Sequence, residues 1–159
     1  MAISVIGTSG KLGRAISEIL RDHQNYYTNA IVYCSGLTNV DECERNPKLS
    51  ALLNVEYPLE LVRGLYMKKN YKFVYISTNY VFDGKKGLYK EKDDKTPINI
   101  YGKHKSFTED NIKLCYPNHL IIRTCSLYDG TKPVSYTGPG PSRTANPTNV
   151  RSLAKCILA

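Results

Sequence analysis

The chain has 159 residues, 42% of them hydrophobic, and a formal net charge of +8. This size and apolar content suit one domain with a buried core, and no window approaches the ~18 apolar residues of a membrane helix, so no membrane partner is expected. The five cysteines are scattered and form no Cys-x-x-Cys pair, which argues against a disulfide framework and against zinc or another metal. The lysines alternate with acids, which favours a solvated basic surface and no nucleic-acid partner, and also suits a phosphate-bearing substrate.

The first expected strand is ISVI at 3–6, and no basic leader precedes it, so a cytoplasmic location is expected. A glycine turn at 7–13 and a helical pattern at 14–20 follow. In this arrangement Gly7 permits a tight turn, Gly10 lets the backbone approach a pyrophosphate, and Gly13 permits close helix packing. The spacing is Gly-x-x-Gly-x-x-Gly rather than Gly-x-Gly-x-x-Gly, and its place after a strand favours nucleotide binding over a plain loop.

A dinucleotide-binding unit should next supply a second strand and its helix, and neither is visible. Instead AIVY at 30–33 is an expected strand that ends at the small residues 34–36, where a nicotinamide ribose could approach the backbone. Pro47 then begins a helical pattern that runs from Leu49 to Leu65. Asn54 lies in its middle, and a satisfied interior amide is the plain alternative for that residue.

The stretch from 73 to 105 carries the chemistry. An expected strand at 73–76 ends at Ser77 and Thr78, where open α/β sheets bind ligands. Tyr101 and Lys105 are four residues apart, so a helix places them on one face. The lysine charge would favour the phenolate, a seryl or threonyl hydroxyl would bond the same reacting oxygen, and together they could protonate a carbonyl as hydride arrives. Taken alone, a Tyr-x-x-x-Lys pair is more often a solvated helix face.

Several motifs, in order, resemble the extended short-chain dehydrogenase/reductases, most closely the dTDP-4-dehydrorhamnose reductase group. They are TNVDxxE at 38–44, STNYVFDG at 77–84, Tyr-x-Glu at 89–91, YGxxK at 101–105, IRT at 122–124 and NPT at 146–148. The resemblance spans almost the whole chain. It implies an α/β, Rossmann-like doubly wound parallel sheet with helices on both faces. Residues 1–128 would form the NAD(P)-binding domain, and 129–159 an abridged remnant of the C-terminal substrate-binding part.

The resemblance also implies a function, namely reduction of the C4 ketone of a nucleotide-linked deoxysugar in the biosynthesis of polysaccharide precursors. Tyr101 would be the general acid, Lys105 its electrostatic and ribose-orienting partner, and Thr78 the third catalytic group. The partner would be a nucleotide-diphosphate sugar, facing Asn79 (an aspartate in the group), Tyr80 and Arg123. The cofactor would contact Gly7, Ser9, Gly10, Lys11, Leu12, Gly13, Cys34, Ser35, Gly36, Asn54 and Ser77.

Members of this group are longer, and two parts have no counterpart here: the second strand with its helix near Tyr27, and much of the segment after Tyr128. Residues 129–143 instead read as a Gly/Pro-rich loop before a closing helix at 149–158. Either the protein is a pared-down relative or internal residues of a longer chain are absent. The flanks match in order while the joints do not, which favours the second, and an intact mass of 17.9 kDa would exclude it.

The cofactor would be NADP or NAD, because the second strand that discriminates between them is absent. Lys11 and Arg14, near the expected phosphates, slightly favour NADPH. Two alternatives stay open: a non-catalytic NADP-binding regulatory subunit, like that of methionine adenosyltransferase, and a nucleotide-sugar epimerase or dehydratase. The intact Thr78, Tyr101 and Lys105 favour an enzyme over a scaffold, and a homodimer is left open.

Overall fold

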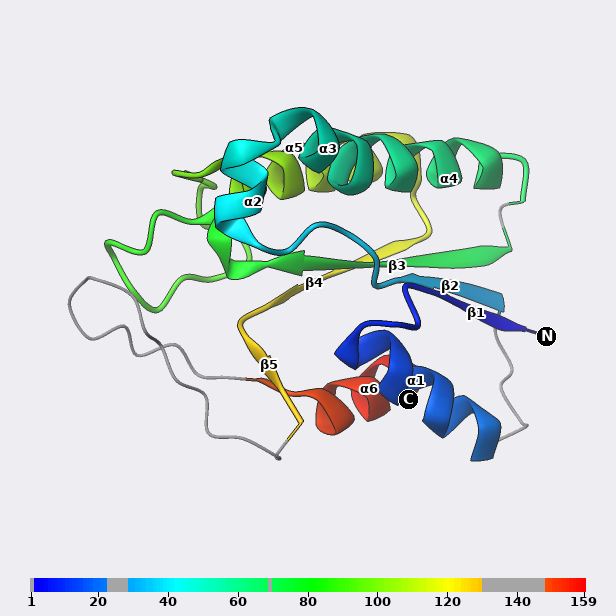
Figure 1. The fold of residues 1–159 in the computed structure, drawn as a ribbon. Helices are drawn as coiled ribbons and strands as arrows, with labels where there is room; N and C mark the ends of the chain where they lie inside the picture. The colour runs from blue at the N-terminus through cyan, green and yellow to red at the C-terminus, as the bar shows by residue number, and fades with distance from the viewer. Residues whose placement is uncertain (1, 23–28, 69, 130–147) are drawn as a thin grey trace.

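The computed structural model describes residues 2–22, 29–68, 70–129 and 148–159. A parallel sheet lies at its centre and is seen along its edge in Figure 1. Its strands, in spatial order, are β1 (Ile3–Ile6), β2 (Asn29–Tyr33), β3 (Tyr71–Thr78) and β4 (His119–Thr124). Among the described residues β1 is therefore an edge strand, paired with β2 alone.

Helices cover both faces of this sheet (Figure 1). One face carries α1 (Lys11–Asp22) and α6 (Val150–Leu158). The other carries α2 (Val40–Arg45), α3 (Pro47–Ala51), the π-helical turn η1 (Leu52–Glu56), α4 (Tyr57–Leu65) and α5 (Ile100–Cys115). The predicted α/β, Rossmann-like doubly wound parallel sheet is confirmed.

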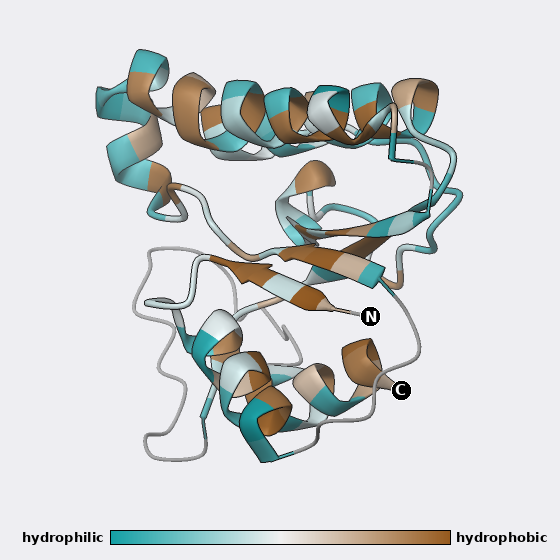
Figure 2. Cartoon of the chain, turned by 90° about the vertical axis from the view of Figure 1, so that its right-hand side faces the viewer, coloured by the Kyte–Doolittle hydropathy of each residue, from teal (hydrophilic) through white to brown (hydrophobic). Residues whose placement is uncertain are grey.

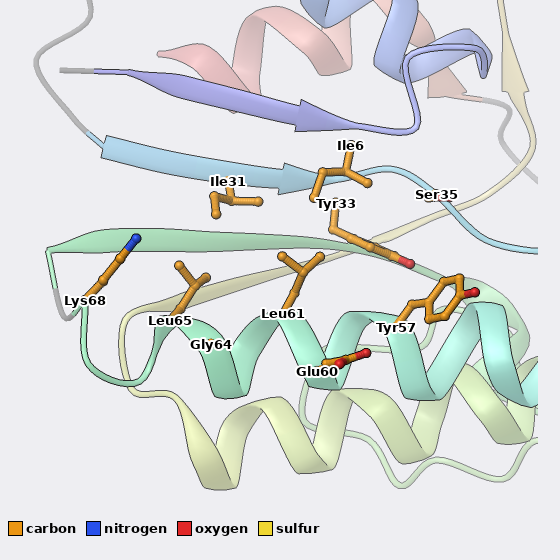
Figure 3. A pocket seen from close by; sticks show the side chains of 10 residues that line it. All are labelled: Ile6, Ile31, Tyr33, Ser35, Tyr57, Glu60, Leu61, Gly64, Leu65 and Lys68. Atoms are coloured by element: carbon orange, nitrogen blue, oxygen red, sulfur yellow. The ribbon is translucent and has the colours of Figure 1, made fainter.

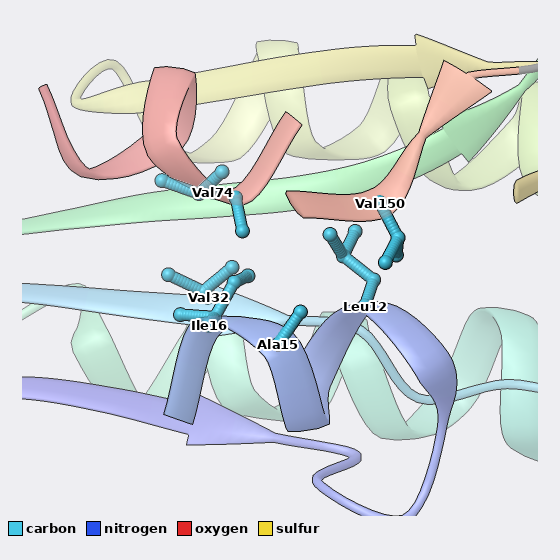
Figure 4. Close-up of a cluster of buried hydrophobic side chains, with 7 residues drawn as sticks. Leu12, Ala15, Ile16, Val32, Val74 and Val150 are labelled. Carbon is cyan, nitrogen blue, oxygen red and sulfur yellow. The ribbon is translucent and has the colours of Figure 1, made fainter. Parts of the chain in front are cut away.

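Alternation along the strands builds a separate core on each face. Val32 and Val74, paired in register, point to α1 and α6, where they meet Leu12, Ile16 and Val150 (Figure 4). The opposite face is more aromatic, with a core formed by Tyr33, Val62, Leu65, Phe73, Tyr75, Ile112 and Tyr116. Figure 2 shows apolar residues along the strands and on the sides of the helices that face them. The closing helix thus packs into the same core as the first helix.

Some elements differ from the expectation. The helical pattern from 49 to 65 is divided into α3, η1 and α4. Two short strands not expected from the sequence, β5 (Leu127–Tyr128) and β6 (Thr148–Asn149), pair in parallel, and Asn149 caps α6. The expected loop at 130–143 and the junction near Tyr27 lie outside the described residues. In the part of the chain that is described, no helix is both long and apolar enough to span a membrane.

Candidate functional site

The carboxyl ends of β1, β2 and β3 meet at one edge of the sheet, because the strands are parallel and in register. Ile6 pairs with Tyr33, and Tyr33 pairs with Tyr75. Strand β3 continues three residues further, to Thr78. The predicted glycine turn, the Cys34–Gly36 segment and the end of β3 are therefore neighbours, which is the place where open α/β sheets bind ligands.

The glycine turn after β1 is tight and leads directly into α1. Gly7 has φ +91°, and a Cβ there would lie 2.7 Å from the Ser35 nitrogen. A Cβ at Gly13 would lie 2.2 Å from the Gly7 oxygen, so only glycine lets α1 approach this closely. Gly10 donates its N–H to the Gly7 oxygen at 3.2 Å, and a Cβ there meets nothing closer than 3.5 Å. An exposed turn at the start of a twelve-residue helix fits a phosphate-bearing cofactor.

Thr78 and Tyr101 form the polar pair at the end of β3. The Thr78 hydroxyl accepts a hydrogen bond from the Tyr80 N–H at 3.2 Å and also pairs with the Tyr101 hydroxyl. Gly102 brings α5 against this turn, since a Cβ there would lie 2.1 Å from the Tyr80 oxygen. The Tyr101 ring is 7% exposed and lies edge-on to Tyr80, with ring centroids 5.9 Å apart.

Lys105 lies beneath this pair with its ammonium buried. Its Nζ donates to the Ile76 oxygen at 2.6 Å and sits 4.0 Å from the centroid of the Tyr75 ring. Burial lowers the pKa of Lys105 to about 7, against the opposing effect of Glu109 and, more weakly, of Cys34. The lysine is one turn from Tyr101 on the same helix, as the spacing predicts.

The pKa of Tyr101 shifts in the opposite direction to the one predicted. Burial raises it to about 12, and the hydrogen bond from Thr78 opposes that rise only in part. The predicted lowering by Lys105 is absent because the ammonium is directed to the Ile76 oxygen and the Tyr75 ring. The phenol is therefore protonated at neutral pH, which is the state that a proton donor requires.

Arg123, predicted to face the sugar, is instead engaged by a buried carboxylate. Its Nε and Nη2 donate to Glu109 at 2.9 and 2.7 Å, and its Nη1 donates to the Glu91 oxygen at 3.2 Å. Burial would raise the pKa of Glu109, but Arg123 and Ser77 lower it overall. The guanidinium also lies over the Phe82 ring. Arg123 thus ties β4 to α5 and to the loop after β3, and its donors are not directed to an open sugar site.

Asn54 is an interior amide whose Nδ2 is satisfied within the protein, while its Oδ1 has no hydrogen-bond partner among the described residues. It is 2% exposed, and its Nδ2 donates to the Leu37 oxygen at 3.0 Å and to the Ser50 hydroxyl at 3.2 Å. Its Oδ1 faces Gly36, where a Cβ would lie 2.5 Å away. Asn54 therefore supports the turn after β2 from behind.

The remaining predicted residues divide by exposure. Ser9, Lys11, Asn79 and Tyr80 are exposed, and Cys34, Ser35 and Gly36 are partly buried. Leu12 is 3% exposed and belongs to the core, and Ser77 is buried beside Glu109. Ser50 and His104, which were not expected at this site, lie beside it, and their side chains meet at 2.8 Å. The available signal was a histidine between Tyr101 and Lys105 in the YGxxK motif.

An apolar groove lies away from the Thr78–Tyr101 pair. It has a volume of about 590 Å³ and runs between α4 and the edge of the sheet at β1 and β2 (Figure 3). Ile6, Ile31, Leu61 and Leu65 give it an apolar lining, and Ser35 is the one predicted site residue in it. Because Thr78 and Tyr101 are absent from its lining, the groove does not define the reacting centre.

Comparisons with known proteins agree on one family. A family model described as the RmlD substrate binding domain matches residues 14–137. A probable low-salt glycan biosynthesis reductase of Haloferax volcanii is 34% identical over 104 residues, and methionine adenosyltransferase 2 subunit beta of Danio rerio is 32% identical over 108 residues. The alignments cover 65% and 66% of this chain, and 34% and 32% of those proteins, so the chain spans about a third of their length.

Solved structures of reductases have the same fold. A dTDP-4-dehydrorhamnose reductase of Clostridium acetobutylicum matches with a TM-score of 0.83 at 27% identity, covering 99% of this chain and 69% of that one. The Bacillus anthracis enzyme of that name, in complex with NADP, matches with a TM-score of 0.68 at 25% identity, covering 79% of this chain and 54% of that one.

Proposed function

The chain belongs to the RmlD substrate binding domain family, and on this premise we propose that it takes part in reducing the C4 ketone of a nucleotide-linked deoxysugar with NADPH or NADH. The observation that carries the proposal is the buried pair of Thr78 and Tyr101 at the end of β3, with Lys105 one turn further on. The named dTDP-4-dehydrorhamnose reductases among the similar structures support the same substrate class.

The residues fit a nicotinamide cofactor at one end of the site. The turn from Gly7 to Gly13, with Ser9, Lys11 and the backbone of Leu12, would hold the pyrophosphate at the start of α1. Cys34, Ser35 and Gly36 would lie near the nicotinamide ribose, with Ser77 behind them. When bound, the cofactor supplies the hydride that reduces the ketone. NADPH is slightly favoured by the basic Lys11 and Arg14 beside that turn.

The protein's own contribution is the movement of a proton. Tyr101 holds a proton at neutral pH and would give it to the ketone oxygen as the carbon is reduced. Thr78, already paired with the phenol, would donate a hydrogen bond to the same oxygen. Lys105, one turn further along α5, would orient the ribose of the cofactor, and Asn79 and Tyr80, exposed beside the pair, would contact the sugar.

The division into a cofactor-binding part, 1–128, and a substrate-binding part, 129–159, remains part of this proposal. Most of the second part lies outside the described residues. The matched reductase of Clostridium acetobutylicum has further chain that this protein does not cover. The proposed activity therefore rests on Thr78, Tyr101 and Lys105, which belong to the first part.

Oxidation of NADPH or NADH in the presence of dTDP-4-keto-6-deoxy sugars, followed by absorbance, tests the function directly. We expect turnover that falls by about 10²-fold or more in Tyr101→Phe, which removes the proton donor. Tyr66→Phe, on an exposed tyrosine remote from the site, should keep full activity. Equal turnover in wild type and Tyr101→Phe would show that Tyr101 is not the acid.

A second candidate, a non-catalytic regulatory subunit, is favoured by one specific similarity, that to methionine adenosyltransferase 2 subunit beta. It predicts cofactor binding without turnover of any 4-ketosugar. Adding the chain to a methionine adenosyltransferase and measuring the rate of that enzyme separates the two. A changed rate together with absent ketosugar turnover would replace the reductase proposal.

A further inference from the structure

Helix α5 is joined to the α3–η1 segment by two side chains that lie one turn apart. His104 Nδ1 lies 2.8 Å from Ser50 Oγ, and Thr108 Oγ1 donates to the Asn54 backbone oxygen at 2.8 Å. Ser50 and Thr108 are fully buried and His104 is partly buried, so the Thr108 bond lies in the interior and the His104 bond at its margin. A spacing of four residues puts both side chains on one side of the helix, with Lys105 next to His104 in sequence. Two fixed points of this kind set the position of a helix along its axis.

The backbone oxygen of Asn54 can accept a hydrogen bond from Thr108 because the residue four positions after Asn54 is a proline. In an α-helix the N–H of residue 58 would donate to the oxygen of residue 54, but residue 58 is Pro58 and has no N–H. The chain is π-helical at this place. The Tyr75 hydroxyl donates to the same oxygen at 3.2 Å. The sequence Asn54-x-x-x-Pro58 thus creates a buried acceptor that α5 uses.

The polar chain continues from Ser50 to the turn after β2. Asn54 Nδ2 donates both to Ser50 Oγ and to the Leu37 oxygen, while its Oδ1 faces Gly36. Since the serine oxygen accepts from Asn54, the serine proton is available to the Nδ1 of His104. Three hydrogen bonds therefore connect α5 to the segment that would lie beside the nicotinamide ribose.

We propose that His104 is a positioning residue, which through Ser50 and Asn54 fixes the place of Tyr101 relative to the turn at Gly36. This inference rests on the proposed reductase function. Tyr101 lies three residues before His104 and seven before Thr108, so His104 is the nearer of the two anchors. Losing it would let the first turns of α5 shift while Thr108 still holds the later part of the helix.

Three variants test this role. His104→Leu keeps bulk and removes the hydrogen bond. His104→Asn places an amide group near the position of Nδ1 and keeps a partner for Ser50. Lys103→Met, on an exposed neighbour in the same turn, is the matched control. Each is measured for kcat, for the KM of NADPH, and for the resonance of the ¹³C-labelled Tyr101 hydroxyl-bearing carbon, assigned by its loss in Tyr101→Phe.

We expect His104→Leu to lower kcat by about 10- to 100-fold, since small displacements of a reacting group have effects of that size, with the KM of NADPH nearly unchanged. The Tyr101 resonance should move in the same variant. His104→Asn should restore both, and Lys103→Met should affect neither. If His104→Leu does not fold, Ser50→Ala interrupts the same chain of hydrogen bonds and is read by the same measurements.

An unchanged kcat together with an unchanged Tyr101 resonance in His104→Leu would overturn the proposal. Equal losses in the Leu and Asn variants would also overturn it, because they would assign the effect to packing. Absence of ketosugar turnover in the wild type would count against the reductase function alone. The Tyr101 resonance would then still decide whether His104 positions the phenol.

Discussion

The buried ammonium of Lys105 predicts a specific pH dependence of folding stability. Its side chain is 3% exposed, and burial lowers its pKa from 10.5 to about 7. Between these values the unfolded chain holds a proton that the folded chain has released, so the free energy of unfolding rises with pH. The burial of Lys105 destabilises the folded protein fully below about pH 7, and this effect disappears as the pH approaches 10.5, the pKa of lysine in the unfolded chain. Integrated from about pH 7 to about pH 9, the gain is about 2 kcal/mol.

Lys105→Met isolates this effect, because titration of the other groups cancels between wild type and variant. Urea unfolding of both proteins at about pH 7 and about pH 9 gives the comparison. The stability of wild type relative to Lys105→Met should rise by about 2 kcal/mol at the higher pH. Lys103→Met, exposed on the same helix, should show no such change. A constant difference between wild type and Lys105→Met at both pH values would refute the reasoning.

Three further predictions concern packing and charge. Gly13→Ala should lower the free energy of unfolding by about 1–3 kcal/mol, because the added Cβ would clash with the backbone at Gly7. Gly10→Ala, where a Cβ has room, should change the free energy of unfolding by no more than about 0.5 kcal/mol and should weaken NADPH binding in a fluorescence titration. Equal losses of stability in the two variants would contradict this. Glu109→Gln should cost about 3–5 kcal/mol in urea unfolding, because it leaves the largely buried Arg123 guanidinium without its carboxylate partner. The exposed Asp110→Asn should cost less than about 1 kcal/mol, and similar costs would show that the Glu109–Arg123 pair is not buried in solution. Because partial burial lowers the pKa of His104, the unfolded chain takes up a proton first as the pH falls below 6.5. The free energy of unfolding should therefore decline there in wild type and less so in His104→Asn, and superimposable pH profiles would exclude a lowered pKa for His104.

Local patterns predicted the elements that carry the proposed chemistry. The strand at 3–6, the glycine turn and the helix spacing of Tyr101 and Lys105 were all visible, because each depends on residues close together in sequence. The ends of the strands at 3–6, 30–33 and 73–76 could be located for the same reason. The rule that strand ends bind ligands placed Ser77 and Thr78 at a ligand site, whereas the pairing of Thr78 with Tyr101 was implied by the resemblance to the reductases.

Properties set by distant residues could not be predicted in this way. The direction of the Tyr101 pKa depends on burial under Tyr80 and on an ammonium turned toward the Ile76 oxygen, and neither is a local feature. Arg123 looked available for a substrate because its partner Glu109 lies fourteen residues earlier, on a different element. The interior place of Asn54 likewise depends on contacts to α5 and to the turn after β2.

The edge position of β1 has a consequence for how the molecule opens. Among the described residues β1 is four residues long and pairs on one side, while β3 is eight residues long and pairs on both. Short strands at an edge take part in local opening at lower free energy than central strands. Amide protons of β1 should therefore exchange with solvent sooner than those of β3. The glycine turn follows β1 directly, so partial unfolding should remove the turn proposed to hold the cofactor phosphates before it separates Thr78 from Tyr101.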